Sequence, residues 1–384
     1  MVIVPVQTRA QWRDFHRLPW RVYAGDPAWV PPLLIERKFH FTPKHNPYFA
    51  HAQMQAFLAY EGAKPVGRIT AQIDALHLAH YNDATGHFGF IEALDDAALF
   101  AGLLETAEDW LRAKGMKQVY GPVSFSLWDQ PGLLVEGFDK PPYVLMGHAR
   151  PYFAPHIEAA GYAPAQDLLA YWYGPQMDVP RVMQRILDRA LARGEITIRN
   201  IHMDKARVDG EIAMLLDIIN DAWSDNWGFV PMTKAEIDDL AGILKLLLRP
   251  GDVAIAEYRG TPAAFAAVFP NLNEAIRDLD GRLLPFGWAR LLWRMKVARV
   301  KSSRMPLMGV RKSLQTSPAG AALALGVIQA TRSFNFAHGV VESELSWILD
   351  SNERVKHVIG LVGGLPYKRY RIYGKSLEVP GRAV

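Results

Sequence analysis

The first half of the chain alternates hydrophobic and polar residues in short runs, a pattern typical of β-strands. One segment differs: between residues 97 and 114 the apolar residues recur every three or four positions, which predicts a helix that ends at Gly115. The predicted strands are 57–60, 66–73, 88–91, 118–123 and 168–173, with a short helix at 155–160. This half therefore predicts an antiparallel meander followed by a helix that crosses to the next strand.

The second half repeats this order of elements, which indicates a duplicated unit. It contains a hairpin that turns at Arg259-Gly260 and then alternates strands with helices. The predicted strands are 196–201, 253–258, 263–269, 307–310, 340–347 and 367–373, and the predicted helices are 208–223, 234–248, 320–334 and 353–361. The two endings match, because Gly161 and Gly363 each stand ten residues before a tyrosine, Tyr171 and Tyr373.

Two domains are expected, because a chain of 384 residues that is 50% apolar can bury more than one core. The predicted joint is 174–180, where a glycine, two prolines and Asp178 cluster. The first domain would cover 1–175, including a proline-rich and aromatic arm at 1–50 with one or two short helices. The second would cover 176–384. The predicted fold class is α/β (α+β), with a mixed, mostly antiparallel sheet flanked by helices in each domain.

The composition excludes several kinds of chemistry. The chain has no cysteine, which excludes disulfides, thiolate metal ligands and cysteine nucleophiles. Its 43 basic and 39 acidic residues give a net charge of +4, too small to favour nucleic acid as a partner. Charged residues interrupt the N-terminus, so no export signal is expected, and the uncharged stretch 318–330 is shorter than the roughly 20 residues of a membrane span. We expect a cytoplasmic protein.

The predicted strand 307–310 leads into a basic loop and then into a helix with small residues near its start. Gly320 and Ala321 would let backbone amides approach a phosphate, and the helix dipole favours negative charge there. The pattern predicts a pyrophosphate cradle, although an ordinary basic loop before a core helix explains it equally well. In the first half, Asp95 and Asp96 stand at the corresponding position and would repel phosphate, so the cradle is expected in the second half.

The predicted strand 340–347 carries carboxylates in its interior. Alternation places Glu342, Glu344 and Ser346 on one face of the sheet. Glu344 is either a solvent-facing or ion-paired residue, or a group that faces a substrate cleft. Because a central strand is covered on both faces, we favour the second interpretation.

These segments resemble the GNAT superfamily of acyl-CoA-dependent N-acyltransferases, in which a strand-loop-helix motif binds the CoA pyrophosphate. Val310, Gln315, Gly320 and Ala321 match that motif loosely, with two additional residues between Gln315 and Gly320. More specific strings are similar to a bacterial family of long, duplicated GNAT proteins. They are 29–32, 66–69, 88–92, 344–352 and 363–373. Within the superfamily, the resemblance is sharpest to the bacterial ceramide synthases.

The resemblance implies two tandem GNAT-like domains and transfer of an acyl group from acyl-CoA to an amine. Aminolysis of a thioester requires a base and an oxyanion donor, and sometimes an acid for the thiolate. Glu344 is the expected base, and Asn352 matches the asparagine that contacts the CoA arm, although it would serve equally well as a helix cap. Many relatives carry an acid tyrosine where this chain has Ile359-Gly360.

Three tyrosines near the C-terminus are candidates for the missing acid, or are packing residues of the last strand. Tyr370 is the predicted catalytic residue, and Tyr367 and Tyr373 lie on the other face of the strand by parity. Lys368, Arg369 and Arg371 would hold phosphates or form a charged strand edge. The predicted CoA contacts are Val310, Arg311, Gln315, Gly320, Ala321 and Asn352.

Residues 281–301 form a basic amphipathic insertion with six basic residues and no acidic one. Tryptophan and leucine accompany these charges, a combination that suits an anionic membrane surface or the mouth of a lipid channel. A core-packed helix with solvated arginines is the alternative. Trp288, Trp293, Arg290 and Arg294 are the predicted lipid contacts. They favour a lipid-like acceptor or acyl chain at the inner face of the membrane. The resemblance to the ceramide synthases implies that the acceptor is a sphingoid amine, which is converted to a ceramide-type lipid.

Other interpretations remain open at this point. The same fold would serve a small polar amine or peptide acceptor, or a non-catalytic pair that binds acyl-CoA or lipid. An aminoacyl-tRNA-dependent transferase is a weaker alternative, because the aromatic stripe of the insertion favours lipid over RNA. Two groups of histidines are candidate metal ligands, namely His77, His80 and His87, and His40, His45 and His51. The spacing of His77 and His80 is a weak signal without cysteines or nearby paired carboxylates, so no metal is expected.

Overall fold

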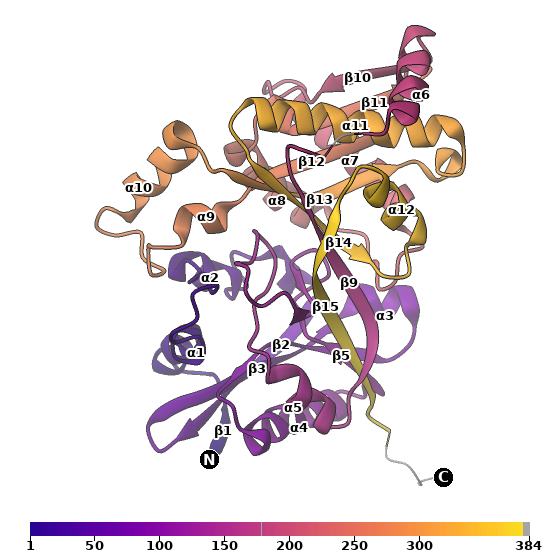
Figure 1. Ribbon diagram of the computed structural model, residues 1–384. Helices are drawn as coiled ribbons and strands as arrows, with labels where there is room; N and C mark the ends of the chain where they lie inside the picture. Colours follow the sequence, from indigo (N-terminus) through magenta and orange to yellow (C-terminus); the bar gives the residue numbers. More distant parts are fainter. Residues whose placement is uncertain (178, 379–384) are drawn as a thin grey trace. The chain divides into compact units, whose positions relative to one another are not determined.

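The computed structural model describes residues 1–177 and 179–378 (Figure 1). Asp178 of the predicted joint and residues 379–384 of the predicted second domain lie outside the described residues. The chain forms two compact units, each assembled from segments that are distant in sequence. The first unit contains Met1–Leu168, Ile276–Gly287 and the C-terminal segment from Lys368, and the second contains Leu169–Ala275 and Trp288–Tyr367.

The first unit is built on a mixed sheet with the strand order β1-β2-β3-β4-β5-β15. Neighbouring strands are antiparallel except β4 and β5, which are parallel. The strands are β1 (Val2–Pro5), β2 (Ala52–Glu61), β3 (Lys64–Asp74), β4 (Thr85–Ala93), β5 (Gln118–Gly121) and three short ones, β6 (Val123–Ser124), β7 (Gln130–Pro131) and β8 (Leu133–Glu136). The helices are α1 (Arg9–Val22), α2 (Leu34–His40), α3 (Ala75–Tyr81), α4 (Ala97–Ala113) and α5 (Phe153–Ala159).

Two consecutive residues of β3 show how helices cover both faces of this sheet. A Cβ atom on Gly67 would lie only 2.7 Å from the Leu103 side chain of α4, so α4 packs closely on that face. The next residue, Arg68, points to the other face, where its Nη1 donates a 2.6 Å hydrogen bond to the carbonyl of Phe15 in α1. Helices α1 and α4 therefore lie on opposite faces.

The second unit has the strand order β9-β14-β13-β12-β11-β10, in which β13 and β14 are parallel. The strands are β9 (Ala163–Tyr173), β10 (Ile196–Asn200), β11 (Val253–Tyr258), β12 (Thr261–Pro270), β13 (Ser302–Val310) and β14 (Glu342–Leu349). Strand β15 (Leu365–Ser376) begins in this unit and belongs to the first unit from Lys368 onward. The helices are α6 (Arg181–Ala192), α7 (Val208–Trp223), α8 (Lys234–Leu247), α9 (Leu272–Ile276), α10 (Gly287–Trp293), α11 (Pro318–Ala337) and α12 (Glu353–Leu361).

Helices α7 and α11 cover opposite faces of this second sheet. Gly309 of β13 faces α7, because a Cβ atom there would lie 3.3 Å from Ala222. Its neighbours Met308 and Val310 pack instead into the apolar cluster to which α11 contributes Leu323 and Val327. The predicted base Glu344 on β14 and the predicted CoA contact Val310 on β13 thus belong to a strand layer that is covered on both sides.

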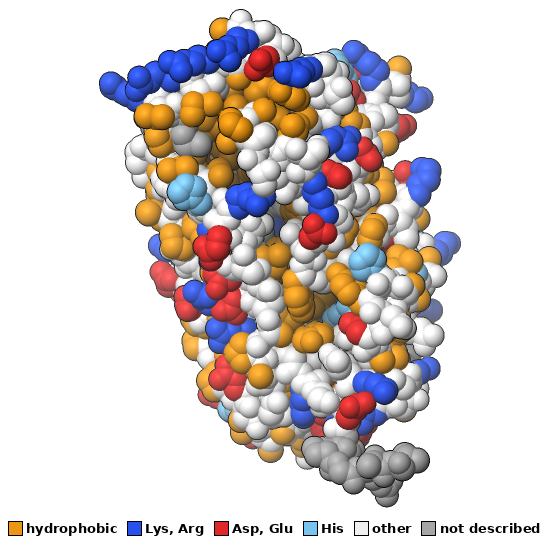
Figure 2. All heavy atoms as spheres, turned by 90° about the vertical axis from the view of Figure 1, so that its right-hand side faces the viewer, with side chains coloured by type: hydrophobic (Ala, Val, Ile, Leu, Met, Phe, Trp, Pro, Cys, Tyr) orange, Lys and Arg blue, Asp and Glu red, His pale blue; other side chains and the backbone are white. Residues whose placement is uncertain are grey.

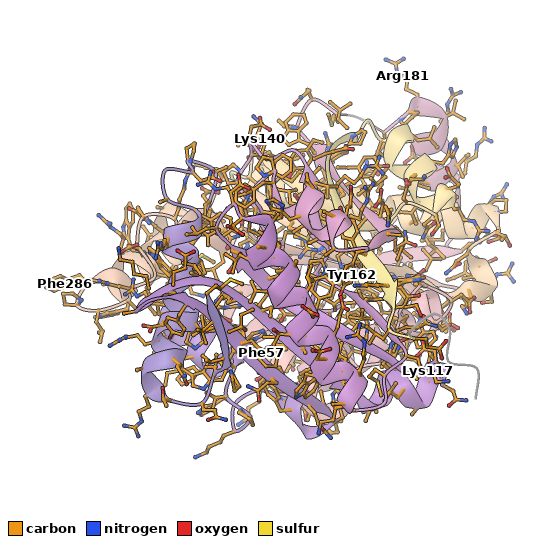
Figure 3. All side chains as sticks on the ribbon, turned by 90° about the horizontal axis from the view of Figure 1, so that it is seen from below. Phe57, Lys117, Lys140, Tyr162, Arg181 and Phe286 are labelled. Atoms are coloured by element: carbon orange, nitrogen blue, oxygen red, sulfur yellow. The ribbon has the colours of Figure 1, made fainter. Side chains whose placement is uncertain are left out.

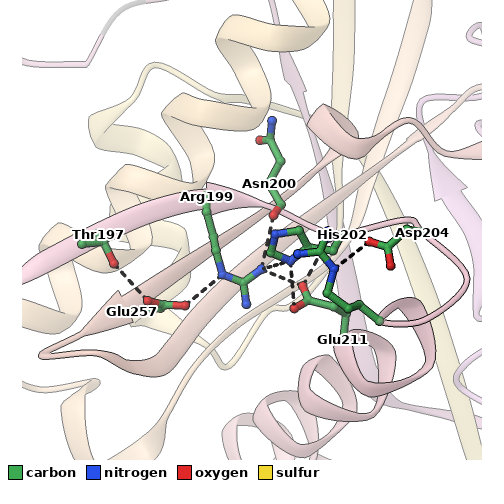
Figure 4. Close-up of polar contacts among 8 residues, drawn as sticks. Thr197, Arg199, Asn200, His202, Asp204, Glu211 and Glu257 are labelled. Atoms are coloured by element: carbon green, nitrogen blue, oxygen red, sulfur yellow. Dashed lines mark hydrogen bonds and ion pairs between the residues drawn. The ribbon is translucent and has the colours of Figure 1, made fainter.

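The edge strand β10 is fixed by one arginine (Figure 4). Arg199 Nε donates to Glu257 Oε1 of β11 at 2.9 Å, and its Nη1 donates to Glu211 Oε2 of α7 at 2.7 Å. Hydrogen bonding to Glu211 and then to Glu257 raises the pKa of Arg199, so it remains charged. This network joins β10, β11 and α7.

The duplication predicted from the sequence is visible in the strand pairing. In each repeat two antiparallel pairings, β2-β3-β4 or β11-β12-β13, precede a parallel pairing with β5 or β14. The final strands are exchanged: β15 pairs with β5 in the first unit, and β9 neighbours β14 in the second. The fold class is confirmed. The predicted division at residue 175 separates sequence repeats and stays a prediction.

Several elements were not predicted from the sequence, among them β1, α3 and α6. Residues 2–5 form β1 and pair with β2, so the predicted arm begins with a strand; α3 was also not predicted. Helix α6 begins immediately after the predicted joint. Its arginines at 181, 185 and 189 recur every fourth residue and are exposed, and basic side chains gather at the top of the face shown in Figure 2, where α6 lies.

Candidate active site

Strands β13 and β14 pair in parallel over only part of their length. The register joins Ser302–Met305 to Glu342–Leu345, whereas the strands continue to Val310 and Leu349. Because parallel strands run in the same direction, the carboxyl ends of β13 and β14 lie at the same end of the sheet. From there the chain leads from β13 to α11 and from β14 to α12. In open sheets of this kind, ligands bind at the carboxyl ends of neighbouring parallel strands.

Arg304 and Glu344 are register partners on these two strands and place opposite charges in the interior. Glu344 has no exposed surface, and Arg304 is 2% exposed. Arg304 Nε lies 3.7 Å from Glu344 Oε1 and donates a 2.8 Å hydrogen bond to Ser346 Oγ, which donates to Glu344 Oε1 at 2.5 Å. The guanidinium therefore balances the carboxylate both directly and through Ser346.

The second oxygen of the same carboxylate accepts a hydrogen bond from Tyr367. The Tyr367 hydroxyl, near the start of β15, donates to Glu344 Oε2. Tyr367 is half-buried, whereas Glu344 is enclosed. The tyrosine is thus a route by which the enclosed carboxylate can exchange a proton with a group outside it. From the sequence, Tyr367 was only an alternative to Tyr370, and Arg304 was not among the predicted residues.

The other two predicted catalytic residues do not join this network. Asn352 Oδ1 accepts a 3.2 Å hydrogen bond from the Val355 amide and so caps α12, the local role that the sequence left open. Tyr370 is fully buried in the first unit, beside Leu134 of β8. Tyr373, also in the first unit, donates to Glu158 at 2.9 Å, and burial together with that carboxylate raises its pKa.

Three acidic residues of α7 and of the turn after it hold the basic loop that follows β13. Arg311 Nη2 contacts Asp217 at 2.5 Å, and Lys312 Nζ contacts Asp225 at 2.6 Å. The backbone amide of Lys312 donates to Asp221 Oδ2 at 2.8 Å. The predicted CoA contact Arg311 and its neighbour Lys312 are therefore already engaged with carboxylates spaced four residues apart.

The remaining residues of the predicted cradle have local structural roles as well. Gln315 Nε2 donates to the carbonyl of Val310 at 2.9 Å and closes the loop onto β13. A Cβ atom on Gly320 would lie 2.0 Å from the Leu314 carbonyl oxygen, and the Gly320 amide donates to the Ser317 cap at 3.0 Å. Close approach of the backbone is therefore enough to require glycine at this position. Phosphate binding by this loop stays a prediction.

Ala321 remains the most accessible part of the predicted cradle. It is exposed in the first turn of α11, and its amide donates to the Ser317 carbonyl at 3.2 Å. The positive end of the helix dipole points to this turn. A negatively charged group placed beside Ala321 would be stabilised without displacing the Gly320 packing.

The insertion forms α10 and a following turn of π-helix, Arg294–Ala298. Trp288, Trp293 and Arg290 are exposed, whereas Arg294 is half-buried and its Nη1 donates to the Ala275 carbonyl at 2.8 Å. The alternative of a core-packed helix is wrong, because α10 has no buried residue.

The histidines and the long helices were also candidates for other functions. His77 Nε2 lies 3.3 Å from Asp83 Oδ2, and within residues 1–177 and 179–378 no three histidine, aspartate or glutamate side chains form a group that could hold a metal ion. Over the same residues, no helix has the length and apolar character needed to cross a membrane.

Similarity to known proteins extends over nearly the whole chain. The sequence is 47% identical over 376 residues to the bacterial ceramide synthase of Caulobacter vibrioides, covering 98% of this chain and 97% of that protein. It is 43% identical over 367 residues to protein YghO of Escherichia coli K12, covering 95% of this chain and 93% of that protein. No protein-family model matches the chain.

Solved structures show the same fold at low sequence identity. A tandem GNAT protein from the clavulanic acid biosynthesis pathway has a TM-score of 0.55 at 12% identity, with 99% of each chain covered. A GCN5-related N-acetyltransferase from Sphaerobacter thermophilus has a TM-score of 0.52 at 12% identity, covering 100% of this chain and 98% of the other. At these identities the likeness concerns the fold alone.

Proposed function

Because the chain belongs to the family of GNAT N-acyltransferases that includes the bacterial ceramide synthase of Caulobacter vibrioides, we propose that it acylates the amine of a long-chain sphingoid base. The donor is an acyl-CoA, and the product is a ceramide-type amide. The arrangement of Arg304, Ser346, Glu344 and Tyr367 at the edge where β13 and β14 separate is the observation that carries the proposal.

The reaction needs one proton acceptor and a route for that proton. The amine nitrogen bonds to the acyl carbon, the carbon–sulfur bond breaks, and CoA leaves as a thiolate, while the nitrogen loses a proton. Tyr367 is the group that touches the amine in this proposal: its oxygen accepts that proton while its own proton passes to Glu344 Oε2. Arg304 and Ser346 hold the carboxylate in place and balance its charge. This chain has Ile359-Gly360 where many relatives carry an acid tyrosine. The CoA thiolate therefore takes its proton from solvent or from the relay formed by Tyr367 and Glu344.

The direct test is an acylation assay with the purified chain. We expect a long-chain acyl-CoA and a sphingoid base to give the amide, detected by mass spectrometry, together with release of free CoA. A small polar amine offered instead should react more slowly. Preferential acylation of the small amine would favour the polar-acceptor alternative, and binding of acyl-CoA without any amide product would favour a non-catalytic binding pair.

We propose that the acyl-CoA phosphates bind at the first turn of α11, and Ala321→Glu tests this. The substitution places a carboxylate at an exposed position where the pyrophosphate would lie, so we expect CoA affinity to fall about tenfold or more at little cost in stability. Ala337→Glu, at an exposed position of the other end of the same helix, is the matched control and should leave affinity unchanged.

Isothermal titration calorimetry with CoA gives both affinities. Equal affinities for the two variants and the wild type would contradict phosphate binding at α11. Gly320→Glu is unsuitable for this purpose, because its Cβ would collide with the Leu314 carbonyl.

A further inference from the structure

Large apolar side chains are exposed in the segment that follows Gly281. The exposed fractions are 79% for Leu284, 78% for Phe286, 56% for Trp293 and 66% for Val297. Figure 3 shows Phe286 projecting away from its ribbon. We call residues 282–299 the exposed segment. Large apolar side chains gathered on one surface segment mark an interaction site, because single exposed ones are common but clusters are not.

The charge of the exposed segment has one sign. Residues 281–301 contain no aspartate or glutamate. The basic side chains are Arg282, Arg290, Arg294, Lys296, Arg299 and Lys301, of which all but Arg294 are exposed. Cationic side chains interleaved with tryptophan, phenylalanine and leucine are the composition of interfacial membrane segments, in which the rings lie at headgroup depth.

Both ends of the exposed segment are held to the folded chain. In the first unit, the Leu34 amide donates to the Gly281 carbonyl at 3.0 Å, and a Cβ atom on Gly281 would lie 2.7 Å from Trp20. In the second unit, the Glu274 carboxylate accepts from the amides of Lys301 and Ser302 at 2.8 and 2.9 Å. The apolar side chains are therefore presented by anchored backbone, which reduces the entropy lost on docking.

We propose that the exposed segment docks on the surface of an anionic lipid bilayer and that the chain takes its long-chain amine there. The second part rests on the proposed function; the docking itself does not. Charge complementarity selects the bilayer, because cations on the segment attract anionic headgroups while the aromatic rings enter the interface. A second copy of the chain that met the segment through its own copy of the segment would bring the same positive charge to the contact and be repelled.

Vesicle flotation of the whole chain measures docking independently of catalytic activity. The wild type should float with phosphatidylcholine vesicles that contain phosphatidylglycerol, and much less with pure phosphatidylcholine or at high salt. Arg290→Gln with Lys296→Gln should lower the partition coefficient by about thirtyfold, as expected for two charges near such a surface. Trp288→Ser with Trp293→Ser should lower it by about tenfold or more.

Helix α6 of the same unit supplies matched controls. Arg185 and Arg189 are exposed, and Val182 and Ile186 are 62% and 45% exposed. Arg185→Gln with Arg189→Gln changes the charge equally, and Val182→Ser with Ile186→Ser also removes exposed apolar surface. Both double variants should float like the wild type.

Several results would overturn the docking proposal. One is a wild type that stays unbound at low salt, and another is loss of flotation in the α6 variants but not in the segment variants. Conversion of a wild-type dimer to a monomer by the tryptophan substitutions would assign the segment to self-association. Normal flotation with no acylation of sphingoid base would leave docking standing and reject the proposed function.

Discussion

Glu344→Gln is expected to lower turnover by about a hundredfold, the usual scale for loss of a general base, and Tyr367→Phe by a similar factor. The two side chains form one proton route, since the Tyr367 hydroxyl donates to the enclosed Glu344 carboxylate. Glutamine keeps an oxygen that can accept from Tyr367 but cannot take up its proton, and phenylalanine keeps the ring but removes the hydroxyl. Steady-state kinetics with saturating acyl-CoA measures both effects.

A double variant separates a shared route from two independent roles. If Glu344 acts through Tyr367, the double substitution should cost no more than either single one, because groups that act as a unit are non-additive. A product of the two single effects would contradict the relay. Ser343→Ala is the control on the opposite face of β14, where Ser343 accepts from Ser303 at 3.0 Å, and it should leave turnover within a few-fold of the wild type.

Stability must be measured on the same variants. Glu344→Gln removes the charge that balances Arg304, so some destabilisation is expected even in a folded variant. Thermal unfolding distinguishes a folded, inactive enzyme from an unfolded one. Turnover close to the wild type for both single variants would give Glu344 a structural role only.

Much of the fold could be predicted because the apolar pattern is local. The spacing of apolar residues gave α7 and α12 with their observed bounds, 208–223 and 353–361. It missed α6, in which arginines at every fourth position obscure the apolar face. The exchange of β9 and β15 could not be predicted, because strand pairing joins segments about two hundred residues apart and depends on packing rather than on local pattern.

Only those features of the candidate site that follow from the alternation of residues within one strand could be predicted. Parity placed Glu344 and Ser346 on one face of their strand, and the hydrogen bond between them confirms that placement. Arg304 lies on another strand, in a part of β13 that was not predicted, and only the parallel register brings it to Glu344. Alternation along the strand shows that Tyr367 and Tyr370 lie on opposite faces. It does not show which of the two faces lies against Glu344, so it could not decide between the two tyrosines.

Two of the sequence strings that resemble duplicated GNAT proteins meet in the first unit. Arg68 of the string 66–69 and Glu92 of the string 88–92 are register partners on β3 and β4 and form a close ion pair with side chains 6% and 17% exposed. The Arg68 guanidinium also lies 4.7 Å from the centre of the Phe15 ring and donates to the Phe15 carbonyl. These strings therefore specify a buried charge pair of the first unit.

Removing one partner of this pair should destabilise the first unit strongly. Arg68→Met leaves the Glu92 carboxylate buried without its nearest counter-charge, which costs about 3–5 kcal/mol in comparable buried pairs. Lys117→Met, which breaks the exposed pair with Glu378 in the same unit, is the control and should cost less than about 1 kcal/mol. Urea unfolding followed by tryptophan fluorescence measures both.

The pH dependence of the Arg68→Met variant identifies the cause of its instability. Burial raises the pKa of Glu92, and attraction to Arg68 opposes that rise, so removing the arginine should raise the pKa of Glu92 further. A carboxyl group whose pKa is higher in the folded than in the unfolded state stabilises the fold at low pH, and this stability is lost as the pH rises through the folded-state pKa. The deficit of the variant should therefore shrink on acidification, and Glu92→Leu in the same chain should restore part of the loss at neutral pH. A deficit that is independent of pH and unrelieved by Glu92→Leu would instead assign the role of Arg68 to its contacts with Phe15.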